Sequence, residues 1–164
     1  MKTIEVRHPL VQHKLGKLRD VATDCVQFRV LAGEIAGLLA YEATRDLPTH
    51  EVTVQTWAGS LDVPHVRGED MTLVPILRAG LGFLPGVQVL LPAAPVSVIG
   101  IARDETTHQP CGYYERLANR MDQRMALLID PMLATGGSAI AAIDLLKAAG
   151  CRSIRCIFLI AAPE

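Results

Sequence analysis

A short run of small and hydroxyl-bearing residues, Thr135-Gly136-Gly137-Ser138, follows a buried apolar segment and opens a helical pattern. Glycines let backbone N–H groups approach an anion closely, and the positive end of the helix dipole favours negative charge there. The Thr135 and Ser138 hydroxyls can donate further hydrogen bonds to a phosphate monoester. Asp130 comes just before the run and could accept from neighbouring sugar hydroxyls. Together these residues predict a site for a ribose 5-phosphate.

Two other interpretations of the run 135–138 were considered: the first is excluded and the second stays open. A Walker A loop carries a lysine directly before its Ser or Thr, and residue 137 is glycine, so the pattern excludes that class of ATP or GTP hydrolase. The simpler interpretation stays open. In it, Gly136-Gly137 is an ordinary strand-to-helix turn and Ser138 only caps the helix.

Two arginines follow apolar segments that predict strands. Arg78 comes after the segment 72–76, and Arg103 comes after 96–101. Ligands of open parallel sheets bind beyond the carboxyl ends of the strands, so both arginines and the run after 125–129 are expected at one crevice. Two guanidinium groups are suited to bidentate contact with a diphosphate. Either arginine alone would be an ordinary solvated charge.

Apolar periodicity predicts the elements that position these residues. A helix is expected from a cap at Thr23 or Asp24 to about Glu42, a second up to about Leu91 and a third over 139–149. Strands are expected at 72–76, 96–101, 125–129 and 154–160, and a hairpin with Gly59 in its turn at 52–63. Pro75 makes a central position for its strand less secure. Apolar strands alternating with helices predict one α/β domain over 1–164, with a parallel sheet flanked by helices.

The polar segment 104–124 separates two of the predicted strands. A long insert of this kind in a small domain is typical of functional loops, so we expect a flexible flap over the site. A plain surface hairpin is the alternative.

Composition limits the classes of partner. The formal net charge of the 164 residues is −1, which argues against binding nucleic acid through a broad basic face. The four cysteines form no CxxC pair, and no apolar run approaches the roughly 18 residues of a membrane span. The first residues lack the apolar core of a signal peptide. A cytoplasmic protein with no membrane partner is therefore expected.

Motifs from one end of the chain to the other share a single pattern. They are His8-Pro9-Leu10-Val11, Tyr41-Glu42-Ala43-Thr44, the octapeptide PILRAGLG at 75–82, Arg103-Asp104-Glu105-Thr106, the run MALLIDPMLATGGS at 125–138, and Ala161-Ala162-Pro163-Glu164. With these motifs the chain resembles the uracil phosphoribosyltransferases, a family of type I phosphoribosyltransferases with a Rossmann-like core. The resemblance implies transfer of a phosphoribosyl group from 5-phosphoribosyl 1-diphosphate (PRPP) to uracil, which yields UMP and diphosphate in pyrimidine salvage.

The resemblance also implies roles for individual residues. Asp130 would contact the ribose hydroxyls and Arg103 the diphosphate, and these two are the expected catalytic residues. Arg78, with the backbone of Ala79 and Gly80, would bind the diphosphate as well. The sugar phosphate would be enclosed by Pro131, Met132, Leu133, Ala134, Thr135, Gly136, Gly137 and Ser138. The resemblance further implies a homo-oligomer, the use of Mg²⁺, and GTP as an activator in some relatives.

The chain departs from the type I pattern in two places. Many relatives carry two adjacent acids where this chain has Asp130-Pro131, so we expect no metal ligand in the protein and Mg²⁺ carried with the diphosphate. The family also continues beyond Glu164 with a segment whose backbone recognises uracil. A C-terminally truncated form is therefore expected, with its donor-binding half complete.

Two alternative functions remain. A module that binds PRPP or a nucleotide without turnover would fit the missing base-recognition segment. A dinucleotide-binding domain is suggested by Gly80-Leu81-Gly82 after a strand, but residue 85 is proline where the fingerprint needs its third glycine.

Overall fold

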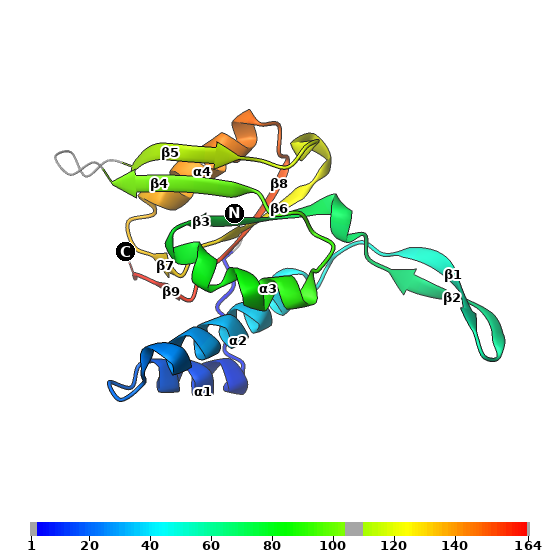
Figure 1. Cartoon of the computed structure of the whole chain (residues 1–164), viewed down its shortest axis with the longest axis horizontal. Coiled ribbons are helices and arrows are strands. Elements are labelled where there is room, and N and C mark those ends of the chain that lie inside the picture. Colours follow the sequence, from blue (N-terminus) through cyan, green and yellow to red (C-terminus); the bar gives the residue numbers. More distant parts are fainter. Residues whose placement is uncertain (1–2, 104–109, 164) are drawn as a thin grey trace.

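A five-stranded sheet forms the middle layer of the molecule, with helices on both of its faces (Figure 1). The computed structural model describes residues 3–103 and 110–163. The elements are α1 (Pro9–Leu18), α2 (Cys25–Ala43), β1 (His50–Thr56), β2 (Gly59–His65), η1 (Gly68–Asp70), β3 (Met71–Leu77), η2 (Ala79–Gly82), α3 (Leu84–Leu90), β4 (Val98–Arg103), β5 (Pro110–Arg116), η3 (Met121–Gln123), β6 (Met125–Ile129), β7 (Met132–Leu133), α4 (Gly137–Ala148), β8 (Ser153–Ile157) and β9 (Ile160–Ala161). The strand order of the large sheet is β5-β4-β3-β6-β8. The expected α/β fold is therefore confirmed.

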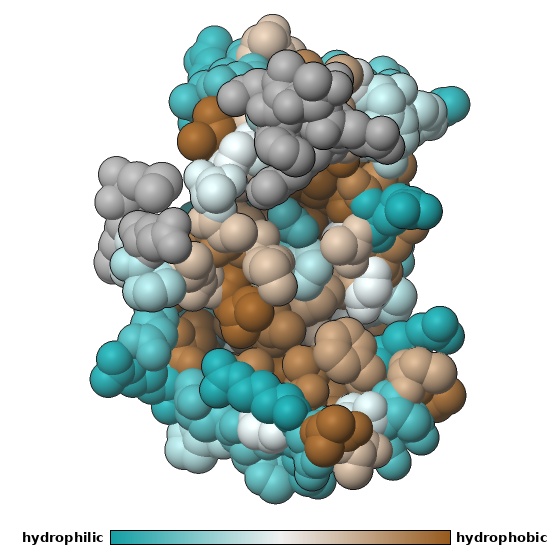
Figure 2. All heavy atoms as spheres, turned by 90° about the vertical axis from the view of Figure 1, so that its left-hand side faces the viewer, coloured by the Kyte–Doolittle hydropathy of each residue, from teal (hydrophilic) through white to brown (hydrophobic). Residues whose placement is uncertain are grey.

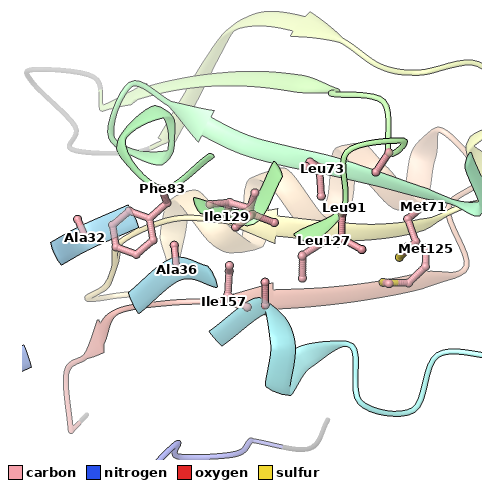
Figure 3. Packing of buried hydrophobic residues seen from close by; sticks show 13 residues of the cluster. Ala32, Ala36, Met71, Leu73, Phe83, Leu91, Met125, Leu127, Ile129 and Ile157 are labelled. Carbon is pink, nitrogen blue, oxygen red and sulfur yellow. The ribbon is translucent and has the colours of Figure 1, made fainter. Parts of the chain in front are cut away.

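Strand β6 is buried along its whole length because helices cover both of its faces. Met125, Leu127 and Ile129 pack with residues of α2 and α3 (Figure 3). Ala126 and Leu128 point to the other face, where α4 packs. A strand buried on both sides lacks polar alternation, which is why the segment 125–129 is apolar at every position.

Proline 75 lies in the central strand β3, although a proline there removes a ladder donor. Leu73 bridges to Val96 and Ile76 pairs with Ile99, so Pro75 falls in a gap of the β3–β4 ladder. On the other side, β3 pairs with β6 without interruption through Pro75 and Ile129. The missing donor thus falls where the sheet already lacks a continuous ladder.

The described part of the expected flap contains an edge strand. β5 pairs with β4 antiparallel, with an irregularity between Gly100 and Ile101, whereas the other pairings of the large sheet are parallel. Residues 104–109 of the expected flap lie outside the described residues. The segment 154–160, expected as one strand, is divided: β8 ends at Ile157 and the separate strand β9 pairs with β7.

Helix α2 begins where the sequence predicts a cap. The Asp24 carboxylate accepts hydrogen bonds from the backbone N–H groups of Val26 and Gln27, at 2.9 and 2.8 Å. Strands β1 and β2 form the expected hairpin, which projects from the body of the molecule as an arm (Figure 1). Within the described residues, no helix combines the length and apolar character that a membrane span requires.

Candidate functional site

The carboxyl ends of β3, β4 and β6 meet at one edge of the sheet because these strands are parallel neighbours. Figure 2 shows this side of the molecule, where hydrophobic surface is gathered across the middle. Exposed apolar side chains of the loops include Leu81, Met132 and Ile160. Ligand sites combine such apolar surface with a few polar groups, so this edge suits a binding site.

The loop that follows β3 packs tightly against the end of β6. A Cβ atom added to Gly80 would lie 2.5 Å from the carbonyl oxygen of Ile129 and 3.1 Å from Pro75. No side chain fits at such a distance, so Gly80 is required for the close approach of the two segments. Ile129 directly precedes Asp130. The loop carrying Arg78 and the residues after β6 are thereby brought side by side.

A small cavity of about 120 Å³ lies over the segment after β6. We call residues 130–138 the 130–138 loop. The cavity is lined by Asp130, Met132, Leu133, Ala134, Gly136, Gly137, Ser138 and Ala139. Seven of these eight residues belong to the predicted site, and Ala139, the first residue of α4 beyond the loop, was not predicted. One carboxylate and the beginning of a helix thus share a single concave surface.

Helix α4 begins with its N-terminus open toward this cavity. Gly136 precedes the helix in the left-handed region at φ 78°, a conformation that favours glycine. No side chain caps the helix, and Ser138 already lies inside it. The simpler interpretation of Ser138 as the helix cap is therefore wrong. With no side-chain cap among the described residues, the first N–H groups of α4 can receive an anion, as at other helix N-termini that bind anions.

Asp130 is half-buried at the beginning of the loop. Burial raises the pKa of this carboxyl to about 6, and the hydrogen bond that it accepts from the Met132 backbone N–H opposes the rise. The carboxylate is consequently charged at neutral pH and protonated below about pH 6. In its charged form it can accept two hydrogen bonds from adjacent hydroxyl groups.

The other predicted site residues lie around the cavity or outside the described part. Arg78 and Ala79 are exposed in the loop after β3, and neither lines the cavity. The Arg78 guanidinium makes no ion pair with another described residue, so it can receive an anion. Pro131 and Thr135 belong to the loop without lining the cavity. Arg103 ends β4 at the same sheet edge, and its side chain lies outside the described residues.

A second, larger cavity of about 390 Å³ lies between α4 and the β4–β5 pair. Its lining is almost entirely apolar, with Ile101, Gly112 and Leu145 among its residues, and it includes none of the predicted site residues. The larger cavity also has a carboxylate, Asp144, but this residue is exposed in the middle of α4. The smaller cavity is the better candidate because it combines the half-buried Asp130 carboxylate with the N-terminus of a helix. Within residues 3–103 and 110–163, no group of three or more metal-binding side chains is found.

The uracil phosphoribosyltransferase family model matches residues 5–164. The chain belongs to the uracil phosphoribosyltransferase family. Among solved structures, the AQ2163 protein from Aquifex aeolicus is 36% identical with a TM-score of 0.93, and the match covers 98% of this chain and 77% of that one. This agreement extends over the cavity, the loop after β3 and the arm.

More distant structures share the fold of this family member. A purine phosphoribosyltransferase from Pyrococcus horikoshii is 16% identical with a TM-score of 0.54, covering 78% of this chain and 71% of that chain. A hypoxanthine-guanine phosphoribosyltransferase from Bacillus anthracis is 13% identical with a TM-score of 0.59, covering 82% and 69%. These two likenesses show the fold, and the family match over residues 5–164 supports a function of the phosphoribosyltransferase type.

Proposed function

We propose that the protein transfers the 5-phosphoribosyl group of PRPP to uracil. The bond between the anomeric carbon and the diphosphate oxygen breaks, and a bond from uracil N1 to that carbon forms while N1 loses its proton. UMP and diphosphate are the products. The observation that supports this proposal is the shared cavity of Asp130 and the glycine turn at Gly136, beside a loop whose Arg78 makes no ion pair with another described residue.

Each part of the site has a place in this reaction. The Asp130 carboxylate accepts from the ribose hydroxyls, and the N–H groups at the start of α4 bind the 5-phosphate. Positive charge develops on the sugar as diphosphate leaves, so Arg78 and Arg103 assist by stabilising the departing group. Uracil loses its proton readily, and positioning it against the anomeric carbon supplies much of the rate. No strong general base is needed.

A magnesium ion fits this site only as part of the substrate. Asp130 is followed by Pro131, and the described residues offer no cluster of three ligands. One carboxylate is too few for a protein-held Mg²⁺ site, so the ion would enter with the diphosphate and neutralise part of its charge. Activation by GTP and assembly into a homo-oligomer stay predictions from the family.

Conversion of radiolabelled uracil in the presence of PRPP and Mg²⁺ tests the proposal. We expect labelled UMP with uracil, and none when adenine or hypoxanthine replaces it. Calorimetric binding of PRPP is measured in parallel. Binding without product would contradict the proposal and support a PRPP-binding module. A thermal shift with NADPH and none with PRPP would instead support a dinucleotide-binding domain.

Replacing Arg103 by alanine should impair the use of PRPP more than it impairs folding. Loss of one hydrogen-bonded charge pair corresponds to about a tenfold lower kcat/KM for PRPP. Arg116→Ala, at the other end of the same strand pair, is the matched control. Steady-state kinetics and circular dichroism melting are compared for both variants. A fall in melting temperature that accounts for the lost activity would refute the assigned role.

The use of PRPP should weaken as pH falls through the pKa of Asp130, which burial raises to about 6. Below that pH the protonated carboxyl donates one hydrogen bond and loses much of its ability to accept from ribose hydroxyls. We expect KM for PRPP to rise between pH 7.5 and pH 5. PRPP itself also titrates, so the same profile is recorded for Asp130→Asn. An identical acid limb in both proteins would show that Asp130 is not responsible.

A further inference from the structure

The arm of β1 and β2 carries a pair of histidines at its root, where the two strands leave the body of the molecule (Figure 1). His50 is the first residue of β1 and His65 the last of β2, and the strand register places them directly opposite each other. Their ring centroids are 5.2 Å apart, and the ring planes are nearly perpendicular, at 87°. His65 is exposed and His50 is half-buried, so small ions from solvent can reach the pair.

The separation of the two rings matches the one that a shared metal ion requires. A tetrahedral Zn²⁺ binds imidazole nitrogens at about 2.0–2.1 Å, which places two such nitrogens about 3.4 Å apart and the ring centroids about 5 Å apart. The observed 5.2 Å meets this requirement with the backbone as it stands. One ring must turn, because in the perpendicular arrangement the edge of one imidazole faces the plane of the other. That turn is about the terminal side-chain torsion, whose preferred range is broad.

The protonation of His50 also suits metal binding. The Nε–H group of Arg67 donates to Nε2 of His50 at 3.5 Å. A nitrogen that accepts a hydrogen bond carries a lone pair, so this imidazole is neutral at Nε2 and its proton lies on Nδ1. The Nε2 atom of a neutral imidazole is a common metal ligand in proteins. A metal ion would take the place of the Arg67 N–H group at this nitrogen, and the nearby guanidinium charge would oppose its binding.

We propose that His50 and His65 form a binding site for Zn²⁺ at the root of the arm. Imidazole suits this ion, whereas Mg²⁺ prefers oxygen ligands and would bind the pair weakly. Within residues 3–103 and 110–163 no third metal-binding side chain joins the two histidines, so water completes the coordination. The arm projects from the side of the molecule opposite β7, so this site is distinct from the cavity over the 130–138 loop (Figure 1).

An ion held by both histidines would connect the two strands at the root of the arm. Nearer the tip, side chains on the opposite face already join the strands: Thr53 donates to Asp62 at 2.6 Å, and Gln55 donates to Ser60 at 2.9 Å. A two-stranded hairpin is only marginally stable by itself. A ligand that binds the folded form alone stabilises that form, so Zn²⁺ should protect the backbone N–H groups of the arm from hydrogen exchange.

Calorimetric titration of the full chain with Zn²⁺ tests the proposal. The exposed thiols of Cys25 and Cys111 also bind this ion, so both are changed to serine in every protein measured. We expect about one equivalent to bind. His50→Ala and His65→Ala should each weaken binding by at least about tenfold, the cost of losing even an outer partner of a metal site. His13→Ala, which removes an exposed histidine of α1, is the control and should leave the affinity unchanged.

Replacing Arg67 should have the opposite effect on the same titration. Arg67→Gln removes a positive charge beside His50, so Zn²⁺ should bind about tenfold more tightly. Arg116→Gln is the control, because Arg116 is an exposed residue of β5 outside the arm. Hydrogen exchange over residues 51–64 is recorded with and without Zn²⁺. The protection of these N–H groups should rise in the unsubstituted arm and stay unchanged in His65→Ala.

Equal Zn²⁺ affinities in His65→Ala and His13→Ala would overturn the proposal, as would the absence of any measurable binding. Because His65 is exposed, its replacement leaves the packing of the body intact and keeps this comparison interpretable even if His50→Ala does not fold. An affinity that does not respond to Arg67→Gln would place the ion elsewhere and also contradict the assignment. None of these measurements uses PRPP, so the site stands or falls independently of the proposed function.

Discussion

Gly80→Ala should lower kcat/KM for PRPP by about 100-fold, because reacting groups displaced by about 1 Å lose catalysis on that scale. The added Cβ would meet the Ile129 carbonyl oxygen at 2.5 Å and the ring of Pro75 at 3.1 Å. Both neighbours belong to buried strands and cannot yield, so the loop carrying Arg78 must move away from the 130–138 loop. The diphosphate group and the ribose would then no longer be held at the correct separation.

The matched control for this substitution is Gly82→Ala. Gly82 lies in the same one-turn helix η2, and a Cβ added to it would meet nothing within 4 Å. Inhibition by diphosphate and by ribose 5-phosphate is measured separately, since only the first ligand should bind more weakly in Gly80→Ala. Equal kinetics for the two alanine variants would contradict the assigned role of the loop.

Asp130→Asn should make the protein more stable and less active. A carboxyl whose pKa is raised from 3.8 to about 6 costs the folded state about 3 kcal/mol once it is charged, and partial exposure to solvent reduces this to about 1–2 kcal/mol. This cost is absent below about pH 4, where the group is neutral in both states, and complete above about pH 6. Asparagine never carries the charge. The variant should therefore melt about 3–6 °C higher at pH 8 and at the same temperature at pH 4.

The lost activity has a separate cause. Without the charge, two hydrogen bonds to ribose hydroxyls weaken, which corresponds to about 100-fold in kcat/KM. Asp144→Asn is the control, because Asp144 is exposed on α4 and makes no ion pair with a described residue. Circular dichroism melting at both pH values and uracil conversion give the two results. A variant that is less stable at pH 8 would contradict the assigned cost of burying this carboxylate.

Helices and strands with a clear apolar run or a capping residue could be predicted from the sequence. The five apolar residues of β6 were predicted with the observed bounds, and the Asp24 cap of α2 was one of two candidates. Strand β5 was expected only under the alternative of a surface hairpin within 104–124, because its residues are mostly exposed and neither alternating burial nor an apolar run marks them. Strands β7 and β9 have two residues each, which is too short for any period to appear.

The same limit applies to the candidate site. The residues of the 130–138 loop were proposed because their types carry the chemistry, and most of them line one cavity. What could not be predicted is contact between segments distant in sequence: Gly80 against Ile129, and residues 159–160 against Pro131. Strand order decides these contacts, and a single sequence does not record which strands become neighbours. Pro75 made a central position of β3 less secure, because local pattern does not show that its missing donor falls in a gap of the β3–β4 ladder.

The arm of β1 and β2 has a practical consequence for every melting experiment above. Trp57 is the single tryptophan of the chain, and it lies fully exposed between the two strands at the end of the arm. Its indole is therefore already solvated in the native protein, and its fluorescence emission is insensitive to loss of the core. The same property makes it a selective probe, since any blue shift of that emission on raising the protein concentration would report that the end of the arm has become covered.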